Sequence, residues 1–287
     1  MPIEEKVGNY KIISPIAAGG MGRVFLAREE TTGRQIAVKV LPEHFLDDRK
    51  RSQYLDREVK VAKRLKHPNV IDIYGLHLQH GIGYLLMELM DGGNLRPCIE
   101  RRSLSLYDSL NLILKICAGL HYIHHHKFED GRFYSIIHRD IKPENILLSK
   151  DGRLKVADFG LSITDDSWWL RGPKSRAGTL FYMSPEQLRG KSLDIRTDIF
   201  SLGLVMYELL TGQLPYKTQD KELYARMVVS KKAKPAPPSY VEKNIPRALD
   251  EITMRALGHD PADRYQTMAE MILDLQRLPP VLKQLSF

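Results

Sequence analysis

The sequence predicts an α+β protein with two lobes, a small lobe built on a sheet with one main helix and a larger, mostly helical lobe. Its length of 287 residues corresponds to about two average domains or one large bilobed unit. Strand-like runs dominate the first 90 residues, and helical periodicity dominates after the glycine pair at 92–93. We therefore expect a first lobe over residues 1–90, a hinge over 91–94 and a second lobe over 95–287.

The first lobe should consist of short strands around one helix. Strand-like runs, rich in β-branched and aromatic residues, occupy residues 10–13, 23–27, 35–40, 70–74 and 83–89. Residues 52–66 have a helical period, because their apolar side chains fall on one face. Pro68 disfavours helical geometry in the residue before it, so this helix should end there.

The second lobe should be mainly helical. Helical periodicity covers residues 105–125, 198–210, 246–257 and 267–278. A short strand pair is expected near 145–157, followed by a loop over 160–185. The proline-rich segment 231–238 should form a further loop.

Composition restricts the class of protein. With 43% hydrophobic and 27% charged residues, the chain can bury a core, and its two cysteines, Cys98 and Cys117, exclude a disulfide framework. The longest apolar stretch, 199–210, is shorter than the roughly 20 residues that span a membrane. We expect a cytoplasmic protein with no membrane segment. The net charge is +8, from 43 basic and 35 acidic residues, but the basic residues are dispersed, so we expect no nucleic-acid partner.

The turn between the first two long strands is rich in small residues. Ala17, Gly19 and Gly22 would let backbone N–H groups approach a polyphosphate closely. Lys39 follows in a strand, on the face opposite Val38. Such glycines also form ordinary turns, and a strand lysine is usually a surface residue, so neither feature decides the function by itself.

Three ordered motifs in the second lobe are more specific. Residues 138–145 are His-Arg-Asp-Ile-Lys-Pro-Glu-Asn, 158–160 are Asp-Phe-Gly and 184–186 are Ser-Pro-Glu. In this order, the sequence resembles the eukaryotic-type (Hanks-type) Ser/Thr protein kinase catalytic domains, most of all the bacterial ones. The resemblance covers about residues 10–278. It implies the bilobed protein-kinase fold, with an antiparallel sheet in the small lobe.

The resemblance implies ATP-dependent phosphorylation of Ser and Thr hydroxyls on protein substrates, with ATP and Mg²⁺ as cofactors and Mn²⁺ as an alternative metal. The implied catalytic residues are Lys39, Glu58, Asp140 and Lys142. The implied nucleotide-contacting residues are Ala17, Gly19, Gly22, Val24, Ala37, Lys39, Met87, Glu88, Met90, Asn145 and Asp158. Asn145 and Asp158 would also bind the metal, because oxygen ligands suit a hard cation.

Each catalytic residue has an implied role. Lys39 would hold the α- and β-phosphates, with Glu58 on the first helix as its ion-pair partner. Asp140 would accept or orient the proton of the attacking hydroxyl, and Lys142 would neutralise the γ-phosphate. The hinge backbone near Met87 would bind adenine.

Further structural and regulatory roles follow from the same resemblance. Glu186 and Arg264 should form a buried ion pair, and Asp198 should anchor the backbone of the catalytic loop. Arg139 should gather a phosphate on the activation loop, by an Arg–phosphate fork. The candidate acceptors are Ser162, Thr164, Ser167 and, preferred, Ser175; Thr179 is expected to contact Asp140 and Lys142.

Some features leave alternatives open. Ala17 stands where the family has the first loop glycine, and this supports an alternative function, a nucleotide-binding scaffold without catalysis. The run His124, His125 and His126 suggests either a metal site or an exposed helix end, of which we favour the exposed end. The expected partners are a protein substrate and ATP, and a homodimer is one arrangement that would allow autophosphorylation.

Overall fold

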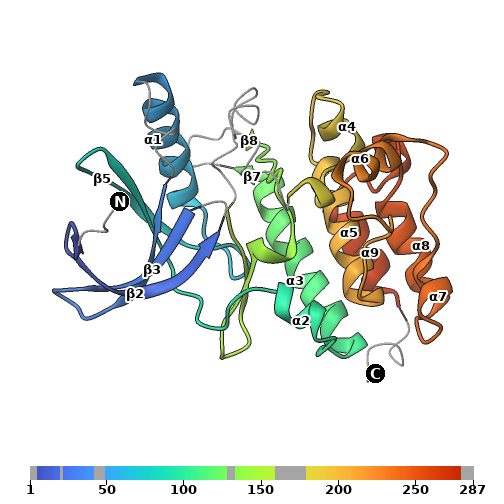
Figure 1. The fold of residues 1–287 in the computed structure, drawn as a ribbon, viewed down its shortest axis with the longest axis horizontal. Coiled ribbons are helices and arrows are strands. Elements are labelled where there is room, and N and C mark those ends of the chain that lie inside the picture. The colour runs from blue at the N-terminus through green and yellow to red at the C-terminus, as the bar shows by residue number, and fades with distance from the viewer. Residues whose placement is uncertain (1–4, 20–21, 42–48, 128–132, 159–178, 279–287) are drawn as a thin grey trace.

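The computed structural model describes residues 5–19, 22–41, 49–127, 133–158 and 179–278. In the first part of the chain, the elements are β1 Lys6–Val7, β2 Tyr10–Gly19, β3 Gly22–Glu29, β4 Gln35–Val40, α1 Arg49–Arg64, β5 Ile73–Gln79 and β6 Ile82–Met87. These six strands form one sheet in the order β1-β2-β3-β4-β6-β5, and every neighbouring pair is antiparallel. This agrees with the predicted α+β class and its small sheet lobe (Figure 1).

The prediction of a strand over 70–74 was wrong about where the strand begins. β5 begins at Ile73 and runs to Gln79, whereas Val70 forms only an isolated bridge to Val156. The reason is tertiary, since Val70 and Ile71 lie against a strand from the other half of the chain. The Ile71 N–H donates to the Val156 carbonyl at 3.0 Å.

The remaining elements are mostly helices. They are α2 Arg96–Glu100, α3 Leu106–His124, β7 His126–Lys127, β8 Phe133–Tyr134, β9 Ile146–Leu148, β10 Leu154–Val156, α4 Pro185–Leu188, α5 Arg196–Thr211, α6 Lys221–Val229, α7 Pro238–Val241, α8 Arg247–Ala256 and α9 Met268–Gln276, with short 3₁₀ turns at Pro143–Asn145, Thr179–Tyr182 and Pro261–Asp263. Helices α4–α9 gather on the opposite side of the molecule from the sheet, whereas α1 lies beside the sheet (Figure 1). The four predicted helical segments correspond to α3, α5, α8 and α9 within two residues at each end.

Helix α5 is buried almost all round, which explains its nearly continuous apolar sequence. It ends at Gly212, whose φ of +72° is favourable only for a residue without a Cβ. Ser105 caps the N-terminus of α3 by accepting a hydrogen bond from the Asp108 N–H at 3.0 Å. These two residues determine where α3 begins and where α5 ends.

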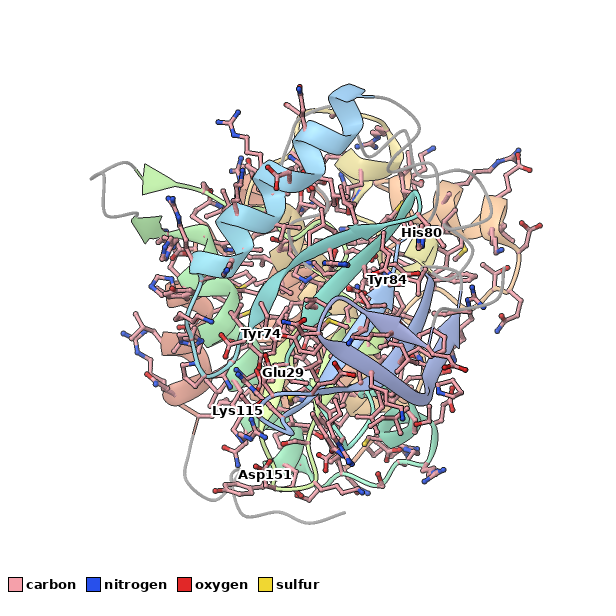
Figure 2. The ribbon with its side chains drawn as sticks, turned by 90° about the vertical axis from the view of Figure 1, so that its left-hand side faces the viewer. Glu29, Tyr74, His80, Tyr84, Lys115 and Asp151 are labelled. Atoms are coloured by element: carbon pink, nitrogen blue, oxygen red, sulfur yellow. The ribbon has the colours of Figure 1, made fainter. Side chains whose placement is uncertain are left out.

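One large apolar core runs through both lobes, and a second small cluster covers the other face of the sheet. The small cluster consists of Val7, Ala27, Ile36, Val38 and Tyr84, the last of which is labelled in Figure 2. Because strand side chains alternate between faces, Val38 packs into this cluster while its neighbour Lys39 points to the opposite face.

The two lobes are connected closely beside the start of the 158–160 motif. The Val156 N–H donates to the Asn69 carbonyl at 2.9 Å, so β10 is held against the loop that follows α1. Gly119 of α3 approaches the same carbonyl, because a Cβ built there would be only 2.6 Å from the Asn69 oxygen. Glycine therefore lets α3 approach the loop closely. No helix in the described ranges has the length and apolar character needed to cross a membrane.

Candidate active site

The sheet register aligns the predicted nucleotide-contacting residues of the small lobe. Ala17 on β2 pairs with Val24 on β3, and Val24 pairs with Lys39 on β4. Gly19 pairs with Gly22 at the end of the hairpin, and Ala37 on β4 pairs with Met87 on β6. Residues that are distant in sequence thus lie across neighbouring strands.

Lys39 forms an ion pair with Asp158. Its Nζ is 2.7 Å from Oδ1 and 2.8 Å from Oδ2 of the carboxylate, and the lysine is only 5% exposed. Burial by itself would raise the pKa of Asp158, but the nearby Lys39 ammonium outweighs it and holds the pKa below its usual value. Asp158 has a φ of +63°, a left-handed conformation that Asp tolerates better than most residues.

Lys39 does not form the predicted ion pair with Glu58, although the structure describes both residues. Glu58 lies on α1 and is buried, but the carboxylate that contacts Lys39 is that of Asp158. A lysine can be paired by either carboxylate, and the choice depends on how α1 is placed relative to the sheet. The sequence contains no information on that distance.

The catalytic-loop residues converge on the carboxylate of Asp140. Lys142 Nζ lies 3.2 Å from Oδ1 and 3.1 Å from Oδ2, and Asn145 Nδ2 donates to Oδ2 at 2.9 Å. A second hydrogen bond joins Asn145 Nδ2 to the Asp140 carbonyl at 2.7 Å. All three side chains are buried, so the carboxylate is held in one orientation beside a cationic group.

Asp198 anchors the backbone of this loop, as predicted. Its Oδ2 accepts from the His138 N–H at 2.7 Å, and its Oδ1 accepts from the Arg139 N–H at 2.8 Å. Arg139 has a φ of +67°, so the anchor maintains a strained backbone directly before Asp140.

His124 completes the anchor, which corrects the expectation of an exposed helix end. It is 3% exposed, and its Nε2 lies 2.8 Å from Asp198 Oδ2, whereas His125 is exposed. The last turn of α3 faces α5, so position 124 belongs to the buried side of the helix. The signal was present in the sequence, because His124 follows Cys117 and Leu120 at helical spacing on the apolar face.

We expect a pH-dependent contribution of Asp198 to stability. Burial by itself would raise the pKa of its carboxyl, but hydrogen bonding from His124 and the loop outweighs it and lowers the pKa. The contribution is therefore complete above the ordinary pKa of about 4 and is lost as the pH falls through the lowered folded-state pKa. Urea unfolding from neutral pH to about pH 3 should show the stability difference between wild type and Asp198→Asn narrowing; a constant difference would contradict the assignment.

The connection between β6 and α2 carries the predicted adenine-binding residues. The Glu88 N–H donates to the Asp72 carbonyl at 2.9 Å, which leaves the Glu88 carbonyl as the backbone group that can face a base. The Glu88 side chain forms ion pairs with Arg153 at 2.7 Å and Lys155 at 2.8 Å. Met87 and Met90, which flank Glu88 in the sequence, are both buried.

One network near the catalytic loop was not anticipated from the sequence. Arg96 on α2 donates to Glu144 at 2.8 Å and to Glu208 on α5 at 2.7 Å, and it also bonds the hydroxyl of Tyr182. Burial by itself would lower the pKa of Arg96, but Tyr182 and Glu208 outweigh it and raise the pKa. Glu144 directly precedes Asn145, so the network holds the catalytic loop from the side of α2.

The predicted pair of Glu186 and Arg264 is confirmed. Arg264 donates from Nη1 and Nη2 to the two carboxylate oxygens of Glu186, at 2.7 and 2.8 Å. Its Nε donates to the Gly258 carbonyl at 2.7 Å, and the arginine is 1% exposed. This bidentate geometry is the strongest form of an arginine–carboxylate contact.

The candidate phosphate acceptors Ser162, Thr164, Ser167 and Ser175 lie outside the described residues, and the predicted contact of Thr179 involves a side chain that is outside them as well. These predictions remain untested.

The donor set fits a divalent cation that is shared with a ligand. Asn145 uses its amide nitrogen for Asp140, so its oxygen is the atom available to a cation, and Asp158 adds a carboxylate. Within the described ranges, no group of three or more His, Cys, Asp and Glu residues can hold a metal by itself. Mg²⁺ is typically bound by one or two carboxylates and completed by phosphate oxygens and water, which matches this sparse set.

A sheet lobe that presents a buried lysine to an aspartate, beside a loop that orients a second aspartate, is the arrangement that the sequence motifs led us to expect of a protein-kinase fold. The family model described as "Protein kinase domain" matches residues 10–275, so the chain belongs to the protein kinase domain family.

The chain is similar to several bacterial kinases. The chain is 34% identical to a probable serine/threonine-protein kinase of Clostridium perfringens, over 95% of this chain and 38% of that protein. It is 32% identical to PrkC of Bacillus subtilis and 34% identical to PknB of Mycolicibacterium smegmatis, over 94% of this chain and 40% and 43% of those proteins. The chain thus spans about two fifths of the length of these relatives. The crystal structure of the Mycobacterium tuberculosis PknI kinase domain has a TM-score of 0.71 and 25% identity, with 94% of this chain and 96% of that chain covered.

Proposed function

We propose that this chain is the active catalytic domain of a serine/threonine protein kinase, which transfers the γ-phosphoryl group of ATP to Ser and Thr hydroxyls of proteins. The observation that carries the proposal is the buried arrangement of Asp140, Lys142 and Asn145. Lys142 and Asn145 hold the Asp140 carboxylate in one orientation, in which it can accept a proton. The relatives named as Ser/Thr kinases support the choice of acceptor.

In this proposal, Asp140 accepts the proton of the substrate hydroxyl, since its carboxylate is held in place by two neighbours. Lys142 provides a positive charge beside the same carboxylate and neutralises the phosphoryl group during transfer. Asn145 and Asp158 supply the oxygen atoms that would hold Mg²⁺, and the bound metal would neutralise charge on the phosphates. Phosphoryl transfer depends mainly on such positioning and charge compensation, which this site provides.

Lys39 must exchange partners for catalysis. Both oxygens of Asp158 now accept hydrogen bonds from Lys39, so a cation at Asp158 would compete with this ammonium. We propose that the ammonium moves to phosphate oxygens when ATP binds, and that Glu58, the buried α1 carboxylate predicted to pair with it, then balances its charge.

The other predicted contacts complete the nucleotide site. The hairpin that carries Ala17, Gly19 and Gly22 would cover the phosphates, and Val24 and Ala37 lie in the same sheet register as Lys39 and Met87. The carbonyl of Glu88 and the backbone of Met90 would bind adenine. We keep 1–90, 91–94 and 95–287 as the proposed lobe and hinge boundaries.

Regulation and location are also part of the proposal. Autophosphorylation on the activation loop, with Ser175 as the preferred acceptor and a homodimer as the arrangement, would place a phosphate near Arg139. A cytoplasmic location of this domain is supported by its two unpaired thiols, Cys98 and Cys117, and by its need for ATP.

The test begins with phosphatase-treated protein incubated with Mg-ATP, and intact mass is measured before and after. We expect mass gains in steps of one phosphate, and no gain in a parallel sample that contains EDTA. Three generic peptides that differ only in a Ser, Thr or Tyr acceptor should show transfer to Ser and Thr. Nucleotide binding without phosphoryl transfer to the protein or to any peptide would instead support the alternative function, a nucleotide-binding scaffold without catalysis.

A further inference from the structure

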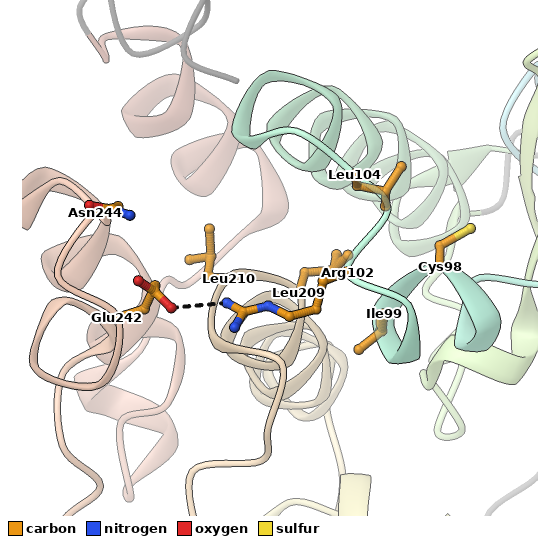
Figure 3. Close-up of a pocket in the computed structure, with 8 residues that line it drawn as sticks. All are labelled: Cys98, Ile99, Arg102, Leu104, Leu209, Leu210, Glu242 and Asn244. Carbon is orange, nitrogen blue, oxygen red and sulfur yellow. Dashed lines mark hydrogen bonds and ion pairs between the residues drawn. The ribbon is translucent and has the colours of Figure 1, made fainter. Parts of the chain in front are cut away.

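A cavity of about 210 Å³ lies between α2, the turn that follows it, the C-terminal end of α5 and the segment 242–244 after α7. Its apolar wall is formed by Ile99, Leu104, Leu209 and Leu210 (Figure 3). An engineered apolar cavity of about 150 Å³ in another protein holds a benzene molecule. The present cavity therefore has room for one six-membered ring with a short polar tail.

The cationic group at this cavity is Arg102. Its φ of +48° is in the left-handed region, the conformation that commonly ends a helix directly after its C-cap, here Arg101. Its Nη2 donates to Glu242 Oε2 at 3.1 Å, and this is the one side-chain hydrogen bond it makes to the described part of the chain. The side chain is 54% exposed, so its other N–H groups can bind an acceptor. Glu242 and Asn244 also line the cavity, so a bound anion would share Arg102 with the Glu242 carboxylate. An apolar wall beside a guanidinium that has further N–H groups to donate fits a carboxylate with a compact apolar body.

The cavity adjoins the Arg96 network through the same two helices. Arg96 lies one turn before Ile99 on α2, and Glu208 directly precedes Leu209 on α5. A ligand that changes the spacing of α2 and α5 would change the 2.7 Å contact between Arg96 and Glu208. It would thereby act on Glu144 and the catalytic loop.

We propose that this cavity is a binding site for a compact amphipathic carboxylate, and that its occupation changes the rate of phosphoryl transfer through Arg96. The claim that a ligand binds here is independent of the proposed kinase function. Only the claim that the ligand changes the rate of phosphoryl transfer rests on that function.

Phenylacetate is a suitable probe, and Cys98 is a built-in reporter. Cys98 lines the cavity and is partly exposed, whereas Cys117 is completely buried, and burial raises the pKa of its thiol to about 12. Labelling with a thiol reagent should therefore modify Cys98 first. We expect phenylacetate to slow this labelling with a roughly millimolar dissociation constant, the range of small fragments. The neutral amide, phenylacetamide, should bind about tenfold more weakly, because it lacks the charged hydrogen bonds.

Two variants separate the apolar and the cationic contributions. Leu104→Trp should fill the cavity and abolish protection of Cys98. Arg102→Gly suits the left-handed backbone and should reduce phenylacetate affinity about tenfold while leaving phenylacetamide nearly unchanged. Arg101→Ala, at the exposed neighbour, is the matched control and should bind phenylacetate as wild type does. Melting curves establish that each variant is folded.

The rate part is tested with a peptide substrate and saturating Mg-ATP. Phenylacetate should change the rate of peptide phosphorylation by wild type at least about twofold. Arg102→Gly and Arg96→Lys should each have the same rate with and without phenylacetate at that concentration. Absence of Cys98 protection, or equal protection in Leu104→Trp, would overturn the site. Protection in wild type without any change in rate would overturn the coupling through Arg96.

Discussion

Replacing Asp140 with Asn should lower kcat for peptide phosphorylation by roughly two to four decades, the usual contribution of a positioned general base. The amide keeps the size of the side chain but cannot take the hydroxyl proton. It also removes the negative charge beside Lys142, whose Nζ is 3.1 Å from the carboxylate. Since neither effect is in the small lobe, KM for ATP should change less than about threefold. Initial rates over a range of ATP and peptide concentrations measure both parameters.

Asp151→Asn is the matched control for this substitution. Asp151 lies in the exposed turn between β9 and β10, where its carboxylate contacts Arg153 at 2.7 Å. We expect wild-type kcat for this variant. A loss of less than about tenfold in Asp140→Asn would remove Asp140 from the role of base.

Arg264→Leu should destabilise the protein by about 3–5 kcal/mol, because it leaves the buried carboxylate of Glu186 without its cation. The carbonyls of Gly258 and Arg196 would also lose a donor, at 2.7 and 2.9 Å. The free energy of unfolding in urea at neutral pH gives the loss directly.

The double variant Arg264→Leu with Glu186→Leu tests the cause. It removes the unpaired charge, so it should regain part of the stability that the single variant loses, but not the part that belongs to the orphaned carbonyls. Arg277→Leu is the surface control, since Arg277 is 76% exposed and 3.5 Å from Asp274, and it should cost less than about 0.5 kcal/mol. A double variant no more stable than Arg264→Leu would show that the charge of Glu186 is not the main cost.

Local periodicity was sufficient for most of the helices. The apolar spacing in 105–125 predicted α3 to within one residue, because a helix that buries one face repeats that face in its sequence. Short elements were missed, among them α2 and α6. α2 has only five residues and begins beside Pro97, so its sequence carries little periodicity, and its position depends on the contacts of Arg96.

The ordered motifs determined the family and placed Asp140, Lys142, Asn145 and Asp158 in one site, because a loop of eight residues keeps most of this set together wherever it folds. The family resemblance also predicted that Asp198 holds the loop and that Glu186 pairs with Arg264, and both contacts are present. Which carboxylate pairs with Lys39, which group His124 contacts on its buried face, and how Arg96 joins two helices were decided only by the tertiary structure. Each of these depends on the distance between elements that are remote in sequence, and that distance results from the packing of the whole core rather than from any local pattern.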